Sequence, residues 1–385
     1  MNRRSFVHAL GAGAIGLVTP TSDDPTVHAS VRASTSAARP DTTDLLHLGA
    51  NENPYGPAPS VLAAVQSAAR DGHRYAGAMQ HTLIHAIAQT HSVPEDAVLL
   101  SGGSGDVLRA VVTAFTGPMK GLVTGAPSYE APVRTAQRAG APLREIPLDL
   151  KLRLDLDAMA ARAAGAGLVY ICNPNNPSST AVTAADVETF VDRVVKKSPS
   201  TRVLIDEAYL DYADRAGVAT AMPLAMKYAQ VIVVRTFSKV HAMAGMRAGY
   251  AIAQPKTLEL IRDYHSGSAV SVMTMAAAMA ALGDMDGLAL NRERNRQVRR
   301  MTAAAFEDAG YRVAESDANF VFVDIRRHAG RFQDACRLRG IAVGRAFPPL
   351  LSWSRISIGT CEEMDRAIPL FLALLASPAA PQAAS

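Results

Sequence analysis

The sequence predicts an α/β protein, with a large domain built on a mostly parallel sheet flanked by helices and a smaller α+β domain. Two observations lead to this fold class. Short apolar runs alternate with segments of helical periodicity through most of the chain, which is typical of strands buried in a parallel sheet with helices on both faces. The chain has 385 residues, 49% hydrophobic and 19% charged, and this length suits two globular domains.

The expected elements follow one another in a regular order. Helices are expected in the first half of the chain at 61–70, 82–89, 107–115 and 184–196. The short apolar strands expected with them are 97–100, 168–172, 203–205 and 231–234. One long helix is expected at 288–309, followed by strands of the smaller domain at 320–323 and 355–358.

The N-terminal segment is typical of an export signal. Arg3 and Arg4 precede a moderately apolar stretch at 6–18, and 27–29 offers a small-x-small pattern for a signal peptidase. The arginine pair, with Phe6 close behind it, resembles a twin-arginine (Tat) signal. We therefore expect the Tat export machinery as a partner and a periplasmic or secreted location. A frayed tail with two chance arginines is the alternative.

These patterns divide the chain into successive segments. The expected segments are a signal peptide at 1–29, a linker at 30–44, an N-terminal part of the small domain at 45–70, a large domain at 71–285, the C-terminal small domain at 286–376 and a disordered tail at 377–385. The linker and the tail are rich in small and polar residues and lack periodicity.

Charge and cysteine content exclude some classes of partner. The net charge is +4, from 39 basic and 35 acidic residues, without a clustered basic stripe, so we expect no nucleic-acid binding. Cys172, Cys336 and Cys361 have no CxxC spacing, so we expect no metal site.

Polar motifs follow the expected strands where these end. They are the turn at 101–106, the Asn/Pro turn at 173–177, Asp206 and the segment 236–239. Ligands of open α/β sheets bind at the carboxyl ends of strands. The common position of these motifs therefore predicts a single site.

The chemistry of each motif has two readings. The glycines of 101–106 suit a phosphate at a helix N-terminus, but a turn without a ligand is an equal alternative. Lys239 is either a solvated charge or a desolvated lysine that forms a Schiff base. In the second case Arg247 and nearby serines could hold a phosphate. Asp206 is either a helix cap or the partner of a protonated pyridine nitrogen.

Eight motifs together resemble a known family. NPNNP (173–177), DEAY (206–209), TFSK (236–239) and AGMRAGY (244–250) have the order and spacing of fold-type-I pyridoxal-phosphate aminotransferases, which share the aspartate-aminotransferase-like fold. NENPYGPAP (51–59), HRYAG (73–77), GAPSYEAP (125–132) and RISIGT (355–360) resemble the histidinol-phosphate aminotransferase-like branch. The resemblance extends from about residue 48 to 375.

The resemblance implies roles around the cofactor ring, pyridoxal 5'-phosphate. Lys239 resembles the Schiff-base lysine that also moves the substrate proton. Asp206 resembles the carboxylate that keeps the pyridine nitrogen protonated. Tyr209 and Asn176 resemble the pair that binds the 3-oxygen of the cofactor, and Tyr129 resembles the aromatic residue stacked on the ring.

The same resemblance implies roles at the phosphate and the substrate. The residues matching the phosphate cup are Gly103, Ser104, Ser238 and Arg247. Tyr75 resembles a tyrosine that reaches the phosphate from the neighbouring subunit, so a homodimer is implied. Arg355 resembles the arginine that binds the anionic group of the substrate, and Arg345 lies nearby in the sequence as either a second substrate ligand or a surface charge.

The implied activity is transfer of an amino group between an amino acid or amino-phosphate and a 2-oxo acid. Decarboxylation, cyclisation or epimerisation on the same scaffold, or a non-catalytic cofactor-binding module, are the alternatives. The sequence departs from the family at 177–179, where Pro-Thr-Gly is usual, and at 104–106, where Ala-Asp-Glu is common. It also lacks a Tyr-x-Pro-Gly stretch between residues 22 and 48. With the export signal, this predicts an ordinary α-amino acid rather than histidinol phosphate as the preferred donor.

Overall fold

The computed structural model describes residues 45–266 and 270–377. The predicted signal peptide and linker lie outside the described residues, as does nearly all of the predicted C-terminal tail. Within the described residues, no single helix is both long and apolar enough to cross a membrane. The helices Val272–Gly283 and Met285–Asp308 reach that length and hydropathy only when they are taken together, and the angle between them is 79°.

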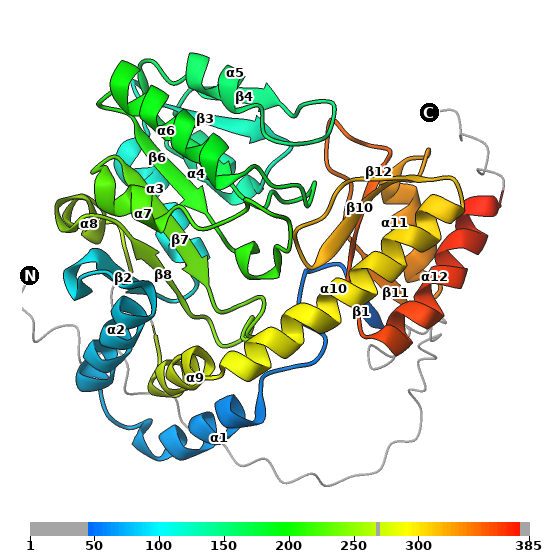
Figure 1. Ribbon diagram of the computed structural model, residues 1–385, viewed down its shortest axis with the longest axis horizontal. Helices are drawn as coiled ribbons and strands as arrows, with labels where there is room; N and C mark the ends of the chain where they lie inside the picture. Colours follow the sequence, from blue (N-terminus) through cyan, green and yellow to red (C-terminus); the bar gives the residue numbers. More distant parts are fainter. Residues whose placement is uncertain (1–44, 267–269, 378–385) are drawn as a thin grey trace, which may run out of the picture. The chain divides into compact units, whose positions relative to one another are not determined.

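The larger domain is built on a seven-stranded sheet in the order β2-β8-β7-β6-β5-β3-β4 (Figure 1). Its strands are β2 (Val98–Ser101), β3 (Gly121–Ala126), β4 (Leu143–Pro147), β5 (Ala166–Cys172), β6 (Arg202–Asp206), β7 (Val231–Thr236) and β8 (Gly249–Ile252). Only β8 runs antiparallel to its two neighbours. The sheet is therefore mostly parallel, and the predicted fold class is confirmed.

Helices cover both faces of this sheet, and the side chains of the strands alternate between them. On β5, Val169 and Ile171 join one apolar cluster, whereas Leu168 and Tyr170 join the other. The first face packs against α2 (Gly77–His91), α5 (Leu156–Ala161), α6 (Ala184–Lys197), α7 (Met222–Lys227) and α9 (Val272–Gly283). The second packs against α3 (Ser104–Phe115), α4 (Glu130–Arg138) and α8 (Pro255–Arg262). Because every residue of β5 is buried, the strand is apolar without alternation.

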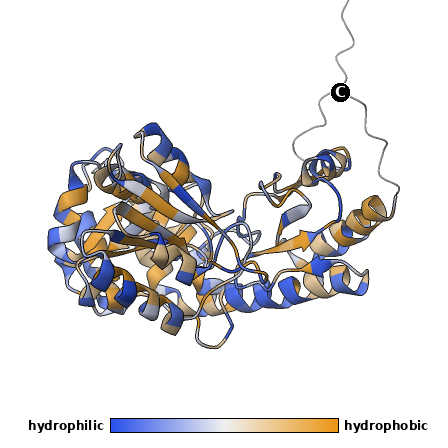
Figure 2. Cartoon of the chain, turned by 90° about the horizontal axis from the view of Figure 1, so that it is seen from above, coloured by the Kyte–Doolittle hydropathy of each residue, from blue (hydrophilic) through white to orange (hydrophobic). Residues whose placement is uncertain are grey.

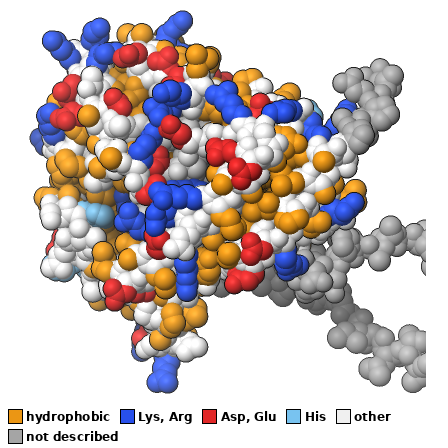
Figure 3. All heavy atoms as spheres, turned by 45° about the vertical axis from the view of Figure 1, so that its right-hand side comes forward, with side chains coloured by type: hydrophobic (Ala, Val, Ile, Leu, Met, Phe, Trp, Pro, Cys, Tyr) orange, Lys and Arg blue, Asp and Glu red, His pale blue; other side chains and the backbone are white. Residues whose placement is uncertain are grey.

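The smaller domain has two short sheets and a core of its own. β1 (Leu46–Leu48) pairs in parallel with β11 (Ile341–Val343), and β10 (Phe320–Asp324) lies between β9 (Arg312–Val313) and β12 (Trp353–Ser357). The helices are α10 (Met285–Asp308), α11 (Ala329–Arg337) and α12 (Cys361–Ala376). Figure 2 shows hydrophobic strands inside each of the two domains. On the face in Figure 3, basic and acidic side chains are interspersed.

The segment 45–70 contacts both domains, which differs from the predicted boundary. We predicted that the whole segment belongs to the smaller domain. β1 does pair with β11 there, but α1 (Pro59–Ala68) packs against α9 of the larger domain. The reason is that Ala68 packs with Val272 and Ala276, and Val61 joins the large-domain core. The chain between β1 and α1 therefore crosses from one domain to the other.

Candidate active site

Residues from several strand ends line a cavity of about 190 Å³ at the carboxyl edge of the large sheet. Its walls include Asp206 at the end of β6, Asn176 beyond β5, Lys239 beyond β7 and Tyr129 beyond β3. A second pocket of about 460 Å³ shares Tyr129 and Asn176 with it and extends to the smaller domain. The polar motifs therefore converge in the structure as predicted. They line the smaller cavity, and the larger pocket adjoins it at Tyr129 and Asn176.

Asp206 is a buried carboxylate with few partners. It is 3% exposed, and it accepts hydrogen bonds from the Tyr170 hydroxyl at 3.0 Å and the Ala208 backbone N–H at 3.2 Å. Burial raises the pKa of Asp206 to about 6, although these hydrogen bonds oppose the shift. A buried anion is stabilised by a cationic partner. Asp206 is therefore suited to hold a protonated ring nitrogen in the cavity.

Tyr170 is a functional residue that the sequence reasoning did not find. It lies on β5 directly beside β6, within the second apolar cluster, and it is fully buried. Burial raises its pKa, so the phenol stays neutral and donates to Asp206. Its position inside an apolar strand gave no signal of this role, because a buried tyrosine is most often part of the core.

Lys239 carries an amine that burial favours in its neutral form. Its Nζ donates to the carbonyl of Asn51 at 3.0 Å and to that of Ala50 at 3.3 Å. Burial, assisted by the nearby charge of Arg355, lowers the pKa of Lys239 to about 8, although Glu52 and Asp206 oppose the shift. A lower pKa leaves more of the neutral amine that attacks an aldehyde. The interpretation of Lys239 as a desolvated lysine that forms a Schiff base therefore fits its surroundings.

The hydroxyl of Tyr209 is held by two amides. The side-chain amides of Asn51 and Asn176 each donate to it, at 3.1 Å. Arg355 donates to the Asn176 side-chain oxygen at 2.7 Å. Because a guanidinium only donates, this contact fixes the Asn176 amide with its nitrogen toward Tyr209. Burial raises the pKa of Tyr209, so the phenol remains protonated.

The residues of the predicted phosphate cup lie around the start of α3. Gly103 has a φ of 94°, and a Cβ there would lie 2.4 Å from an Arg247 guanidinium nitrogen, so this approach requires glycine. Arg247 lies 3.4 Å from the Ser238 hydroxyl, and Ser104 is the first residue of the helix. A helix N-terminus beside a guanidinium is suited to bind an anion.

Asp106, in the same turn, pairs with residues outside this cup. Its carboxylate pairs with Arg109, with the Ser266 hydroxyl at 2.6 Å and with His265 at 3.2 Å. Burial raises the pKa of Asp106, but the hydrogen bonds from Ser266 and Arg109 and the nearby positive charges outweigh this effect. The pKa of Asp106 therefore lies below its usual value. In the turn at 104–106, which departs from the family pattern, the one carboxylate is therefore held by its own partners beside the anion site.

Arg355 is a partly buried cation that lines the larger pocket. Besides Asn176, it donates to the Gly49 carbonyl at 2.6 Å, and the Phe320 and Phe347 rings lie 5.6 and 5.0 Å from its guanidinium carbon. Its Nε has no hydrogen-bond partner among the described residues. Arg355 lines the larger pocket without an acidic partner among the described residues, so its guanidinium is suited to bind a carboxylate.

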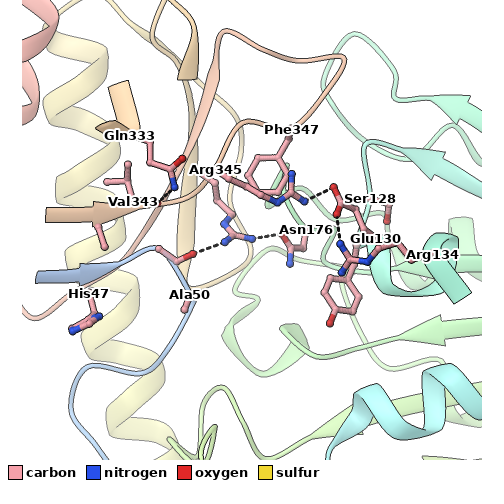
Figure 4. A pocket seen from close by; sticks show the side chains of 14 residues that line it. His47, Ala50, Ser128, Glu130, Arg134, Asn176, Gln333, Val343, Arg345 and Phe347 are labelled. Atoms are coloured by element: carbon pink, nitrogen blue, oxygen red, sulfur yellow. Dashed lines mark hydrogen bonds and ion pairs between the residues drawn. The ribbon is translucent and has the colours of Figure 1, made fainter. Parts of the chain in front are cut away.

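Arg345 lies at the rim and is already paired. It forms an ion pair with Glu130, and Glu130 also accepts from Arg134 at 2.8 Å (Figure 4). Its side chain is 45% exposed and lies over the Phe347 ring at 4.2 Å. Both arginines named from the sequence thus line one pocket, where Arg355 is partly buried and Arg345 is exposed.

Tyr75 is the one predicted site residue that the structure leaves apart from the others. It is fully exposed and does not line either pocket. A role in a neighbouring subunit's site requires such exposure in a single chain.

Comparisons with known proteins agree with this site. The model of the family "aminotransferase class I and II" matches residues 43–370, and the chain belongs to that family. A histidinol-phosphate aminotransferase of Symbiobacterium thermophilum is 34% identical over 86% of this chain and 91% of its own length. An aromatic amino acid aminotransferase of Rhodococcus opacus is also 34% identical, over 83% of this chain and 87% of its own length.

Solved structures give the same result. A putative histidinol-phosphate aminotransferase of Erwinia carotovora atroseptica has a TM-score of 0.83 at 30% identity, over 87% of this chain and 97% of its own. The Sinorhizobium meliloti histidinol-phosphate aminotransferase in complex with pyridoxal-5'-phosphate has a TM-score of 0.79 at 29% identity, over 86% of this chain and 92% of its own. This chain is a pyridoxal-phosphate-dependent aminotransferase of fold type I, in the histidinol-phosphate aminotransferase-like branch.

The residues present fit this cofactor. Gly103, Ser104, Ser238 and Arg247 would hold its phosphate, Asp206 its ring nitrogen, and Lys239 its aldehyde carbon. When bound, pyridoxal phosphate supplies an electron sink for the bond broken at the substrate's Cα. Asp206 would keep a proton on the ring nitrogen, Lys239 Nζ would move the proton of Cα, and Arg355 would orient the substrate through its carboxylate.

Replacement of Asp206 by alanine tests the role of the buried carboxylate. We expect Asp206→Ala to retain some cofactor but to lower kcat by about 100-fold or more, because loss of a buried charge-assisted partner is worth a few kcal/mol. Steady-state kinetics with saturating cofactor measure this. Asp211→Asn is the matched control, since Asp211 pairs with Arg235 and does not line the cavity. A near-normal kcat for Asp206→Ala would show that the carboxylate has no such role.

Proposed function

We propose that this aminotransferase moves an amino group between an α-amino acid with an uncharged side chain and a 2-oxo acid, with Arg355 binding the α-carboxylate. The observation that carries the proposal is the state of the cations in the larger pocket. Arg355 lines this pocket and forms no ion pair with a described acidic residue, whereas Arg345 and Arg134 are both paired with Glu130. One cation is thus available for one carboxylate, and the others are neutralised in part.

The remaining surface of the larger pocket supports this substrate class. Tyr129, Val343 and Phe347 line this pocket and provide apolar area. An apolar or aromatic side chain would bury area against them. The name of the Rhodococcus opacus relative, an aromatic amino acid aminotransferase, agrees with such a donor.

Histidinol phosphate is the second candidate donor. The names of several relatives favour it, and Arg345 and Arg134 lie where a phosphate could replace Glu130 as their partner. An exposed ion pair is worth only about 0–1 kcal/mol, so this replacement carries a small cost. Histidinol phosphate would therefore displace Glu130 from these two arginines, whereas the proposed α-amino acid would leave their ion pairs with Glu130 in place.

Donor kinetics separate these candidates. We expect kcat/KM for an aromatic or aliphatic α-amino acid to exceed that for histidinol phosphate. We also expect Arg355→Ala to raise KM for donor and acceptor acids alike by roughly 100-fold, because a charge-assisted pair is lost. Glu130→Gln should improve the use of histidinol phosphate relative to the uncharged donor, since it frees Arg345. A clear preference of the unaltered enzyme for histidinol phosphate would overturn the proposed substrate.

We also propose that the active enzyme is a homodimer in which Tyr75 reaches the phosphate cup of the neighbouring subunit. The full exposure of Tyr75, within a motif resembling the family's, supports this proposal. Light scattering should give at least twice the chain mass, and Tyr75→Phe should weaken cofactor binding by about 10-fold, the loss of one hydrogen bond to a charged group. A fully active monomer would contradict the proposal.

Export through the twin-arginine machinery is a further proposal, supported by Arg3, Arg4 and the apolar stretch that follows them. Replacement of both arginines by lysine keeps the charge and should leave the protein in the cytoplasm, because the machinery reads the arginine pair as an address. Cell fractionation followed by immunoblotting measures this. An equal periplasmic yield of the double variant would refute the proposal.

A further inference from the structure

Asn51 joins three parts of the active site that come from distant segments of the chain. Its backbone N–H donates to the Ser357 hydroxyl at 2.9 Å, and its side-chain oxygen accepts from the same hydroxyl at 2.9 Å. Its side-chain nitrogen donates to Tyr209, and its carbonyl accepts from Lys239. The residue is 1% exposed. We propose that Asn51 is a positioning residue that directs the hydroxyl proton of Tyr209 into the cofactor cavity, toward the cofactor's 3-oxygen.

The hydrogen-bond inventory of Tyr209 carries this inference. A phenol oxygen has two acceptor positions and one proton. The amides of Asn51 and Asn176 both donate to it, at 3.1 Å, which fills the two acceptor positions. None of the described residues accepts its proton, and Tyr209 lines the cavity. The proton is therefore left for an acceptor inside the cavity.

Ser357 determines which end of the Asn51 amide faces Tyr209. The single hydroxyl proton of Ser357 goes to the Asn51 side-chain oxygen, while the Ser357 oxygen accepts from the Asn51 backbone N–H. This orientation leaves the amide nitrogen for Tyr209. With the opposite orientation the amide oxygen would take the Tyr209 proton, and the cofactor would lose a donor.

The backbone of Asn51 explains why asparagine suits this position. Its φ is 55°, a left-handed conformation that asparagine, aspartate and glycine adopt more readily than other residues. This conformation is accompanied by the contact of its carbonyl with Lys239. Aspartate and glycine are therefore the substitutions that change the side chain with least disturbance of the backbone.

The holoenzyme without substrate provides a direct test. A proton shared between Lys239 Nζ and the cofactor's 3-oxygen is lost as the pH rises, and the visible absorbance of the bound cofactor reports it. A hydrogen-bond donor stabilises the more negative form of the 3-oxygen and lowers the pH of this change. We expect Asn51→Asp, whose carboxylate would accept the Tyr209 proton, to raise the midpoint by about one unit or more, and Asn51→Gly by about half a unit.

Two further variants distinguish positioning from a merely structural role. In a Tyr209→Phe background, Asn51→Gly should leave the midpoint unchanged, because the hydroxyl that it directs is absent. Asn53→Ala is the matched control, since Asn53 lies in the same segment and donates to the Val240 carbonyl at 2.9 Å rather than to Tyr209. It should leave the midpoint unchanged.

The inference rests on the bound cofactor and not on the proposed substrate, because no donor is present in the titration. Unaltered midpoints in both Asn51→Asp and Asn51→Gly, with cofactor bound and the melting temperature retained, would overturn it. Equal shifts from Asn51→Gly with and without the Tyr209 hydroxyl would also overturn it, since they would assign the effect to the backbone.

Discussion

The burial of one carboxylate, Asp206, is the constraint on which the rest of the site depends. It lies at the end of β6, the middle strand of the large sheet, and is 3% exposed. Tyr170 and a backbone N–H satisfy it only in part, and burial raises its pKa to about 6. A buried anion is costly unless it is paired. The protonated ring nitrogen of pyridoxal phosphate would supply the missing cation, so that cofactor binding and the chemistry of the site would depend on the same pairing.

A second consequence of the fold is that neither domain holds the complete site. The large sheet provides Asp206, Tyr209 and Lys239, whereas Arg355 comes from β12 of the smaller domain. The segment after β1 crosses between them, and Asn51 in that segment bonds both Tyr209 and Ser357. The residues that would hold the cofactor ring and the substrate anion therefore contact each other through a few buried amides. A shift of the smaller domain would change the hydrogen bonds of the ring.

Sequence patterns predicted the central strands and the cofactor residues, because both have local signals. Apolar runs mark β5, β6 and β7, and the motifs at their ends contain Asn176, Asp206 and Lys239. The partners of these residues had no local signal. Ser357 is 306 positions from Asn51, and only the fold brings them together. The helix α9 was also missed, because its alanine- and methionine-rich segment is apolar on nearly all sides and lacks helical periodicity.

The account depends most on Lys239 as the residue that binds the cofactor covalently, and borohydride trapping tests this most directly. Reduction of the holoenzyme fixes the cofactor to its lysine, and peptide mass spectrometry then locates the adduct. The depressed pKa of Lys239, near 8, and its place beside Asp206 predict one modified residue, at position 239. The adduct and nearly all turnover should be lost in Lys239→Ala. An adduct at another lysine, or full turnover in that variant, would contradict the account.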